Sequence, residues 1–184
     1  PREYLERLKI GVMDESTLTL DEEMKTVLEL TQDETNRLED GLGELRQQIW
    51  DHERSNVEVL ELSEGRQAYF IPAFPELGEQ VQDGIGQLAE NTLGADRAAF
   101  FMHRFNEMAD GHLRTFARFG KFGRKIEFTS YDDGERIGVK VSHYDGPLEE
   151  GKHRMQSAGS YEEVPKEFQH LFREEITEPD PKLK

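Results

Sequence analysis

The sequence predicts an α+β fold in which long amphipathic helices pack on an antiparallel sheet built from two β-hairpins. Three observations support this prediction. Apolar residues recur at helical spacing in three long segments, the pattern changes to strict alternation in two other places, and a glycine-containing turn interrupts each alternating stretch. At 184 residues, the chain has the size of a single domain, or of one domain with a tail.

The N-terminal third contains three helix starts. Segment 2–10 has helical spacing of its apolar residues and ends at Gly11. Thr19 is followed three residues later by Glu22, and Thr31 by Glu34. This spacing is that of a capping box, in which the threonine and the glutamate each bond to the backbone of the other.

The helix after the second box is predicted over 32–54, because its apolar residues are spaced by four, three and four positions. They form one stripe: Leu38, Leu42, Leu45 and Ile49.

The first predicted hairpin pairs residues 57–62 with residues 67–71 across a turn at 63–65. Pro75 then suits the first position of a helix, where its missing N–H is not needed. That helix is predicted to end at Gly94, with an apolar stripe of Leu77, Val81, Ile85 and Leu88.

A third long helix is predicted over 95–119. Its apolar side chains fall within about 60° of one direction at 100° per residue, which indicates a buried face. The residues on this face are Phe101, Phe105, Met108, His112, Phe116 and Phe119.

The second predicted hairpin pairs residues 125–131 with residues 136–143. The acids between them, Asp132, Asp133 and Glu135, suggest a cation site, but a tight turn around Asp-Gly explains these residue types better. We expect a single domain over 1–145, followed by a loosely ordered tail over 146–184 with a short docking helix near 164–173.

The formal charge of −16 argues against a general nucleic-acid-binding protein. The absence of cysteine excludes disulfides, thiolate nucleophiles and cysteine metal sites. No segment has the roughly 20 apolar residues of a membrane span, so we expect no transmembrane segment in this sequence. The sequence indicates no cofactor.

The stretch 111–126 has five basic residues and no acidic residue, unlike the rest of the chain. Interleaved with phenylalanines, these cations suggest an anion- or partner-binding surface, consisting of Arg114, Arg118, Lys121, Arg124 and Lys125. The alternative explanation is that cations are favoured in the last turn of a helix by its dipole.

Two histidines lie in the third helix. His103, Glu107 and Asp110 share one polar face and could supply metal ligands, although this pattern is also that of a solvated face. His112 lies in the apolar stripe, where a neutral core histidine and a pKa-shifted group at a cleft are the alternatives.

No phosphate-binding loop, nucleophile elbow or zinc-protease signature occurs. The helix start at 30–34 resembles that of the LTxxQ helical-hairpin proteins of the bacterial periplasm, which have a glutamine where this chain has Glu34. The Leu-Thr box together with the Ile71–Pro75 stretch resembles uncharacterised bacterial proteins with a membrane-anchored N-terminus. These resemblances imply an extracytoplasmic location and a non-catalytic role.

Three functional hypotheses follow. The first is a non-catalytic binding or regulatory domain that acts on a protein partner or by self-association. The second is a metal-dependent enzyme that uses the face of His103, Glu107 and Asp110. The third is an anion-binding surface at residues 114–125.

Overall fold

The computed structural model describes residues 10–14, 19–63, 65–111, 114–132, 137–145 and 154–172. The helix predicted at 2–10, His112 and the turn at 133–136 therefore lie outside the described residues, apart from Ile10. The predicted α+β class is confirmed, because helices occur together with a two-stranded and a five-stranded antiparallel sheet.

Contacts between residues divide the chain into two compact units. The helical unit comprises Pro1–Ile49 and Glu76–Phe119, and the sheet unit comprises Trp50–Pro75 and Gly120–Lys184. The boundary predicted at residue 145 does not separate the units, because the sheet unit continues across it.

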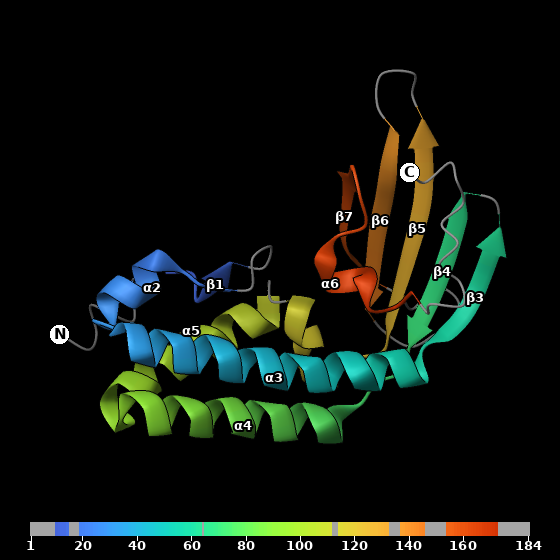
Figure 1. Ribbon diagram of the computed structural model, residues 1–184. Helices are drawn as coiled ribbons and strands as arrows, with labels where there is room; N and C mark the ends of the chain where they lie inside the picture. Colours follow the sequence, from blue (N-terminus) through green and yellow to red (C-terminus); the bar gives the residue numbers. More distant parts are fainter. Residues whose placement is uncertain are drawn as a thin grey trace. The chain divides into compact units, whose positions relative to one another are not determined.

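Most of the helices belong to the helical unit (Figure 1). Its helices α3 and α4 follow the predicted segments closely, and Gly94 ends α4 with a φ of 76°. The elements are β1 (Met13–Asp14), β2 (Thr19–Leu20), α2 (Glu22–Val27), α3 (Gln32–Asn56), α4 (Pro75–Leu93), α5 (Ala95–Gly111) and the 3-10 helix η1 (Arg114–Gly120). The unit boundary crosses α3 after Ile49.

Of the two predicted capping boxes, only the second is present. Glu34 accepts a hydrogen bond from the Thr31 backbone N–H at 2.9 Å, and its own N–H donates to the Thr31 hydroxyl at 3.3 Å. At the first position Thr19 belongs to β2, and Asp21 caps α2 by accepting from the Glu23 N–H at 2.8 Å. A carboxylate nearer to the helix competes successfully for the same role.

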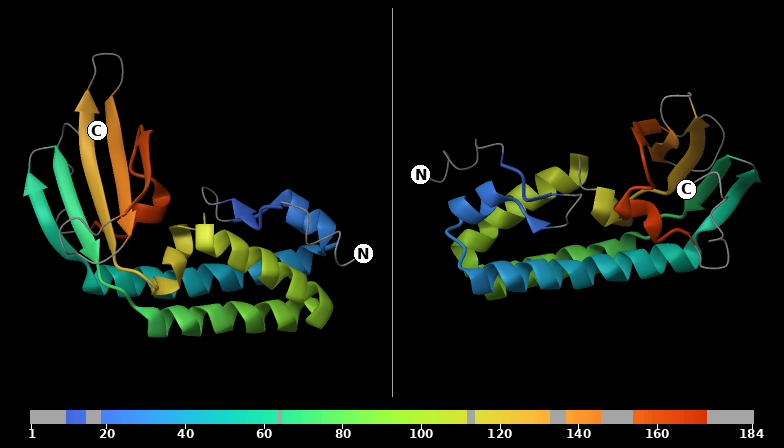
Figure 2. Two further views of the ribbon diagram at one scale, coloured as in Figure 1. Left: turned by 180° about the vertical axis from the view of Figure 1, so that it is seen from behind. Right: turned by 45° about the horizontal axis from the view of Figure 1, so that its top comes forward.

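Small residues let α3 and α4 approach each other closely, side by side in Figures 1 and 2. A Cβ at Gly41 would lie 2.6 Å from the Leu88 side chain, and one at Gly84 would lie 2.9 Å from that of Leu45. The glycines of the two helices therefore face the leucines of the opposite helix.

The third helix ends earlier than the sequence predicted. The α-helix stops at Gly111, and a separate 3-10 helix, η1, follows at Arg114. The phenylalanines of the predicted stripe are nevertheless buried, because the chain turns them into the same core: Phe101, Phe105, Phe116 and Phe119. Met108 is partly buried.

The end of η1 has an unusual backbone. Arg118, Phe119 and Gly120 all have positive φ, at 48°, 51° and 62°. A left-handed conformation is unfavourable for a bulky residue such as Phe119. The carbonyl of Phe119 is held against α4, where an added Cβ at Gly78 would lie only 1.7 Å from that oxygen.

The five-stranded sheet has the order β3-β4-β5-β6-β7, and each neighbouring pair is antiparallel. Both predicted hairpins are present, although β7 lies within the predicted tail. Residues 72–123, which include α4 and α5, separate the adjacent strands β4 and β5. The strands are β3 (Glu58–Ser63), β4 (Arg66–Ile71), β5 (Arg124–Asp132), β6 (Ile137–Asp145) and β7 (Arg154–Tyr161).

The segment around α6 (Lys166–Gln169), which is the short helix predicted near 164–173, packs against one face of the sheet (Figure 2). The Phe168 ring packs edge-on against Phe128 with ring centres 6.0 Å apart, and Phe172 contacts both Phe128 and Tyr69. These aromatic contacts make α6 part of the core of the sheet unit.

The pKa of Glu34 should lie well below the ordinary value for a glutamate. Hydrogen bonds from Arg97 and from the Thr31 backbone lower its pKa from 4.5 to about 2. Because the folded-state pKa is lowered, this ion pair stabilises the protein above pH 4.5, and the contribution is lost as the pH falls toward 2.

We expect an NMR titration of the Glu34 carboxyl to show this low pKa, and Arg97→Met to raise it toward the ordinary value. Lys25→Met, which removes a cation from α2 that pairs with Glu22 and Glu39, is the control and should leave Glu34 unchanged. An unperturbed Glu34 in the native protein would contradict the assignment.

Candidate functional site

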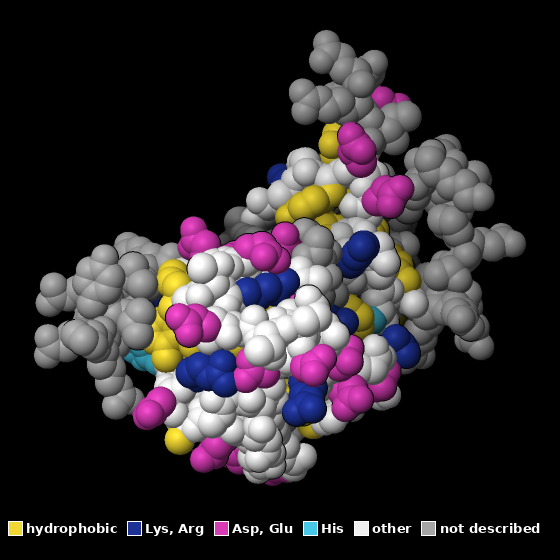
Figure 3. All heavy atoms as spheres, turned by 60° about the vertical axis from the view of Figure 1, so that its left-hand side comes forward, with side chains coloured by type: hydrophobic (Ala, Val, Ile, Leu, Met, Phe, Trp, Pro, Cys, Tyr) yellow, Lys and Arg dark blue, Asp and Glu magenta, His cyan; other side chains and the backbone are white. Residues whose placement is uncertain are grey.

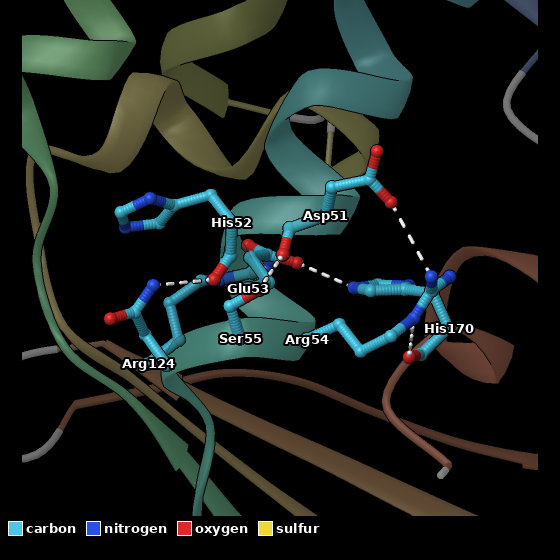
Figure 4. Close-up of polar contacts among 8 residues, drawn as sticks. Asp51, His52, Glu53, Arg54, Ser55, Arg124 and His170 are labelled. Atoms are coloured by element: carbon cyan, nitrogen blue, oxygen red, sulfur yellow. Dashed lines mark hydrogen bonds and ion pairs between the residues drawn. The ribbon is translucent and has the colours of Figure 1, made fainter. Parts of the chain in front are cut away.

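Three ionisable residues that are distant in the sequence meet inside the sheet unit (Figure 4). Glu53 lies near the end of α3, Arg124 is the first residue of β5, and His170 follows α6 directly. We call these three residues the buried cluster. All three are counted among the buried polar residues of the structure.

The Glu53 carboxylate is the centre of the buried cluster. One of its oxygens accepts a hydrogen bond from the Arg124 guanidinium, and the other lies 2.6 Å from His170 Nε2. Trp50 stacks on the His170 ring, with ring centres 5.0 Å apart and planes 9° from parallel. Arg54 donates to the His170 backbone carbonyl at 3.3 Å.

The buried cluster is closed to solvent. The exposed fractions of the Glu53 and Arg124 side chains are 1% and 4%, and that of His170 is 2%. Burial by itself raises the pKa of Glu53, but the charge of Arg124 and the hydrogen bond and charge of His170 outweigh it, so the pKa lies below 4.5. Glu53 is therefore an anion in the folded protein at neutral pH.

A histidine next to a carboxylate is the arrangement that enzymes use for acid–base catalysis. A substrate would have to reach the pair, however, and here both side chains are enclosed by Trp50, Arg124 and the end of α3. The described contacts instead join α3, β5 and the segment after α6. The buried cluster thus positions three segments of the sheet unit.

The opposite face of the sheet has its own polar network. Side chains alternate along a strand, so Lys125 and Glu127 lie on the other face from Arg124 and Ile126. Lys125 Nζ lies 2.7 Å from Glu127, and Arg66 lies 3.4 Å from it. The Tyr144 hydroxyl donates to Glu127 at 3.3 Å.

The structure does not bring the predicted basic residues together as one surface. Arg124 is buried in its pair with Glu53, whereas Lys125 lies on the opposite face of β5. Arg118 is partly buried, Lys121 is exposed, and the side chain of Arg114 lies outside the described part. On the face drawn in Figure 3, Lys and Arg side chains are interspersed with Asp and Glu.

The predicted metal ligands are placed only in part. His103 Nε2 lies 3.9 Å from Glu107 Oε1, and both side chains are about half exposed, at 47% and 48%. Glu107 also pairs with Arg104, and the Asp110 side chain lies outside the described residues. Within the described residues, no three His, Asp or Glu side chains are placed to hold a metal ion together.

Sequence reasoning missed the buried cluster. Arg124 was considered only as part of a basic surface, and Glu53 and His170 are separated by 117 positions without any local pattern that links them. His52, next to Glu53, packs on Phe74 with ring centres 4.8 Å apart. The one available signal is that His170 lies in a segment with the apolar residues Phe168 and Leu171.

No family model matches the chain, and no curated protein or solved structure is significantly similar to it. Among the described residues, none of the helices has the length and apolar character required to cross a membrane.

Proposed function

We propose that this chain is a non-catalytic binding domain that acts on a protein partner through its sheet unit. One observation carries the proposal. The large hydrophobic side chains that are exposed among the described residues all belong to that unit: Val59 at 45%, Leu60 at 40% and Phe122 at 49%. A protein partner that binds this unit would remove these apolar side chains from water.

The charge arrangement supports the same proposal. The acid and base best placed for proton transfer, Glu53 and His170, are enclosed and engaged in positioning the fold. The network at Glu127 engages Arg66 and Lys125 on the other face of the sheet. The resemblance of residues 18–54 and 71–75 to extracytoplasmic bacterial proteins supports a location outside the cytoplasm as part of this proposal.

Photocrosslinking in the source organism tests the proposal. A benzoylphenylalanine at Phe122 replaces one exposed aromatic ring by another and should form an adduct of a single, discrete mass with a partner protein. The control position is Glu79, which is exposed on α4 in the helical unit.

We expect no such adduct from Glu79. The same adduct from both positions, or no discrete adduct from Phe122, would contradict binding through the sheet unit.

A further inference from the structure

The outer edge of β3 is an open end of the five-stranded sheet. Among the residues that the structure describes, β3 pairs only with β4, so the backbone groups along its other side have no strand partner there. Such an edge accepts an additional extended chain, because unpaired N–H and C=O groups form ladder hydrogen bonds with it.

Two neighbouring side chains at this edge, those of Val59 and Leu60, are apolar and solvent-exposed. Glu58, Val59 and Leu60 are consecutive exposed residues, and Val59 and Leu60 are two of the three exposed large hydrophobics among the described residues. The register shifts between Val59 and Glu61, which leaves Leu60 outside the regular pairing with β4. The other edge strand, β7, has exposed Ala158 and Ser160 instead.

The charge of the edge determines what can pair with it. Glu58 and Glu61 bracket the two apolar residues in the sequence, and the whole chain has a charge of −16. A second copy of the chain would bring acidic residues against acidic residues, which is unfavourable for paired strands. A basic strand would place opposite charges across the new pair.

We propose that the open edge of β3 binds an extended segment of a partner protein in which Lys or Arg alternates with apolar residues. The segment adds a sixth strand, its backbone pairs with β3, its apolar side chains cover Val59 and Leu60, and its cations face Glu58. This inference rests on the proposed function, for which it names the surface and the chemical class of partner.

The test uses the full chain and a capped peptide of alternating lysine and valine as the probe. Hydrogen–deuterium exchange should show new protection of the amides of residues 58–63, with none at β7. A peptide of alternating glutamate and valine should bind at least about tenfold more weakly, because like charges then oppose the pairing.

The double substitution Val59→Ser and Leu60→Ser should weaken binding of the lysine–valine peptide by about tenfold, as should Glu58→Lys, which leaves the apolar residues in place. Ala158→Ser is the control, because it replaces an exposed apolar residue of the other edge strand, β7, and should leave peptide binding unchanged. The emission of Trp50 verifies that each variant is folded.

Several outcomes would overturn the inference: no protection of β3 at millimolar peptide, equal binding of the acidic peptide, or protection of β7 instead. A dimer that forms without peptide and is lost in the β3 variants would assign the edge to a second copy. In each case a persisting crosslink at Phe122 would show that the proposed function itself stands.

Discussion

Replacing Arg124 by methionine is expected to lower the free energy of unfolding of the sheet unit by about 3–5 kcal/mol, because the substitution leaves the carboxylate of Glu53 buried without its cation. The charge of Glu53 is enclosed on all sides, with 1% of the side chain exposed. Among the described contacts of the Glu53 carboxylate, the one with His170 then remains.

Urea unfolding followed by the fluorescence of Trp50 measures this loss, since Trp50 is the single tryptophan and stacks on His170. Lys125→Met is the matched control: it removes the neighbouring cation, whose ion pair with Glu127 lies on the other face of the sheet. We expect this control to cost less than about 1 kcal/mol. An equal decrease in the free energy of unfolding of the two variants would show that the buried ion pair stabilises the protein no more than the pair of Lys125 with Glu127 does.

The difference between Arg124→Met and the native protein should also depend on pH. The folded-state pKa of Glu53 is lowered below 4.5, so the stabilisation by Arg124 is fully present above that value. It is lost as the pH falls through the folded-state pKa, because a protonated Glu53 has no charge to compensate. The stability gap between the two proteins therefore narrows in acid.

Replacing Gly78 by alanine should destabilise the helical unit by about 3 kcal/mol or more. The new Cβ would lie 1.7 Å from the carbonyl oxygen of Phe119, which is a backbone atom and cannot rotate away. Phe119 already has a φ of 51°, so the segment has little freedom to move.

Gly86→Ala, in the same helix, is the control and should increase the stability of the protein instead of lowering it. The nearest atom that a Cβ at Gly86 would meet is the Met102 Cε, at 4.0 Å, which is ordinary contact. Alanine is favoured over glycine in a helix by about 1 kcal/mol, so this variant should be more stable. Circular dichroism at 222 nm follows both, and destabilisation of the two variants to the same extent would refute the close approach at Gly78.

The elements that depend on neighbouring residues were predictable from the sequence. The capping box of Thr31 and Glu34 fixed the start of α3, and Pro75 and Gly94 bounded α4, because each of these signals acts within one helical turn. The turn residues between the alternating segments are local signals of the same kind, and they predicted the two hairpins. The cluster of apolar residues near Phe168 predicted α6.

The features that depend on distant partners were not predictable. Strand β7 has few large apolar residues and is a strand because it pairs with β6, so its sequence indicated a tail. The change from α5 to the 3-10 helix η1 was not predictable, because the burial of Phe116 and Phe119 also fits an uninterrupted helix on a helical wheel. The contact of Glu53 with Arg124 and His170 exists only once α3, β5 and α6 are assembled.

The long segment between β4 and β5 determines the order in which the strands of the sheet can pair during synthesis. The hairpin of β3 and β4 leaves the ribosome well before residue 124, where its neighbour β5 begins. Until then the nascent hairpin exposes both of its edges. Doubling the length of an intervening loop costs only about 0.6 kcal/mol, but distant pairings form slowly. The two hairpins therefore pair with each other, through β4 and β5, only after α4 and α5 have been synthesised.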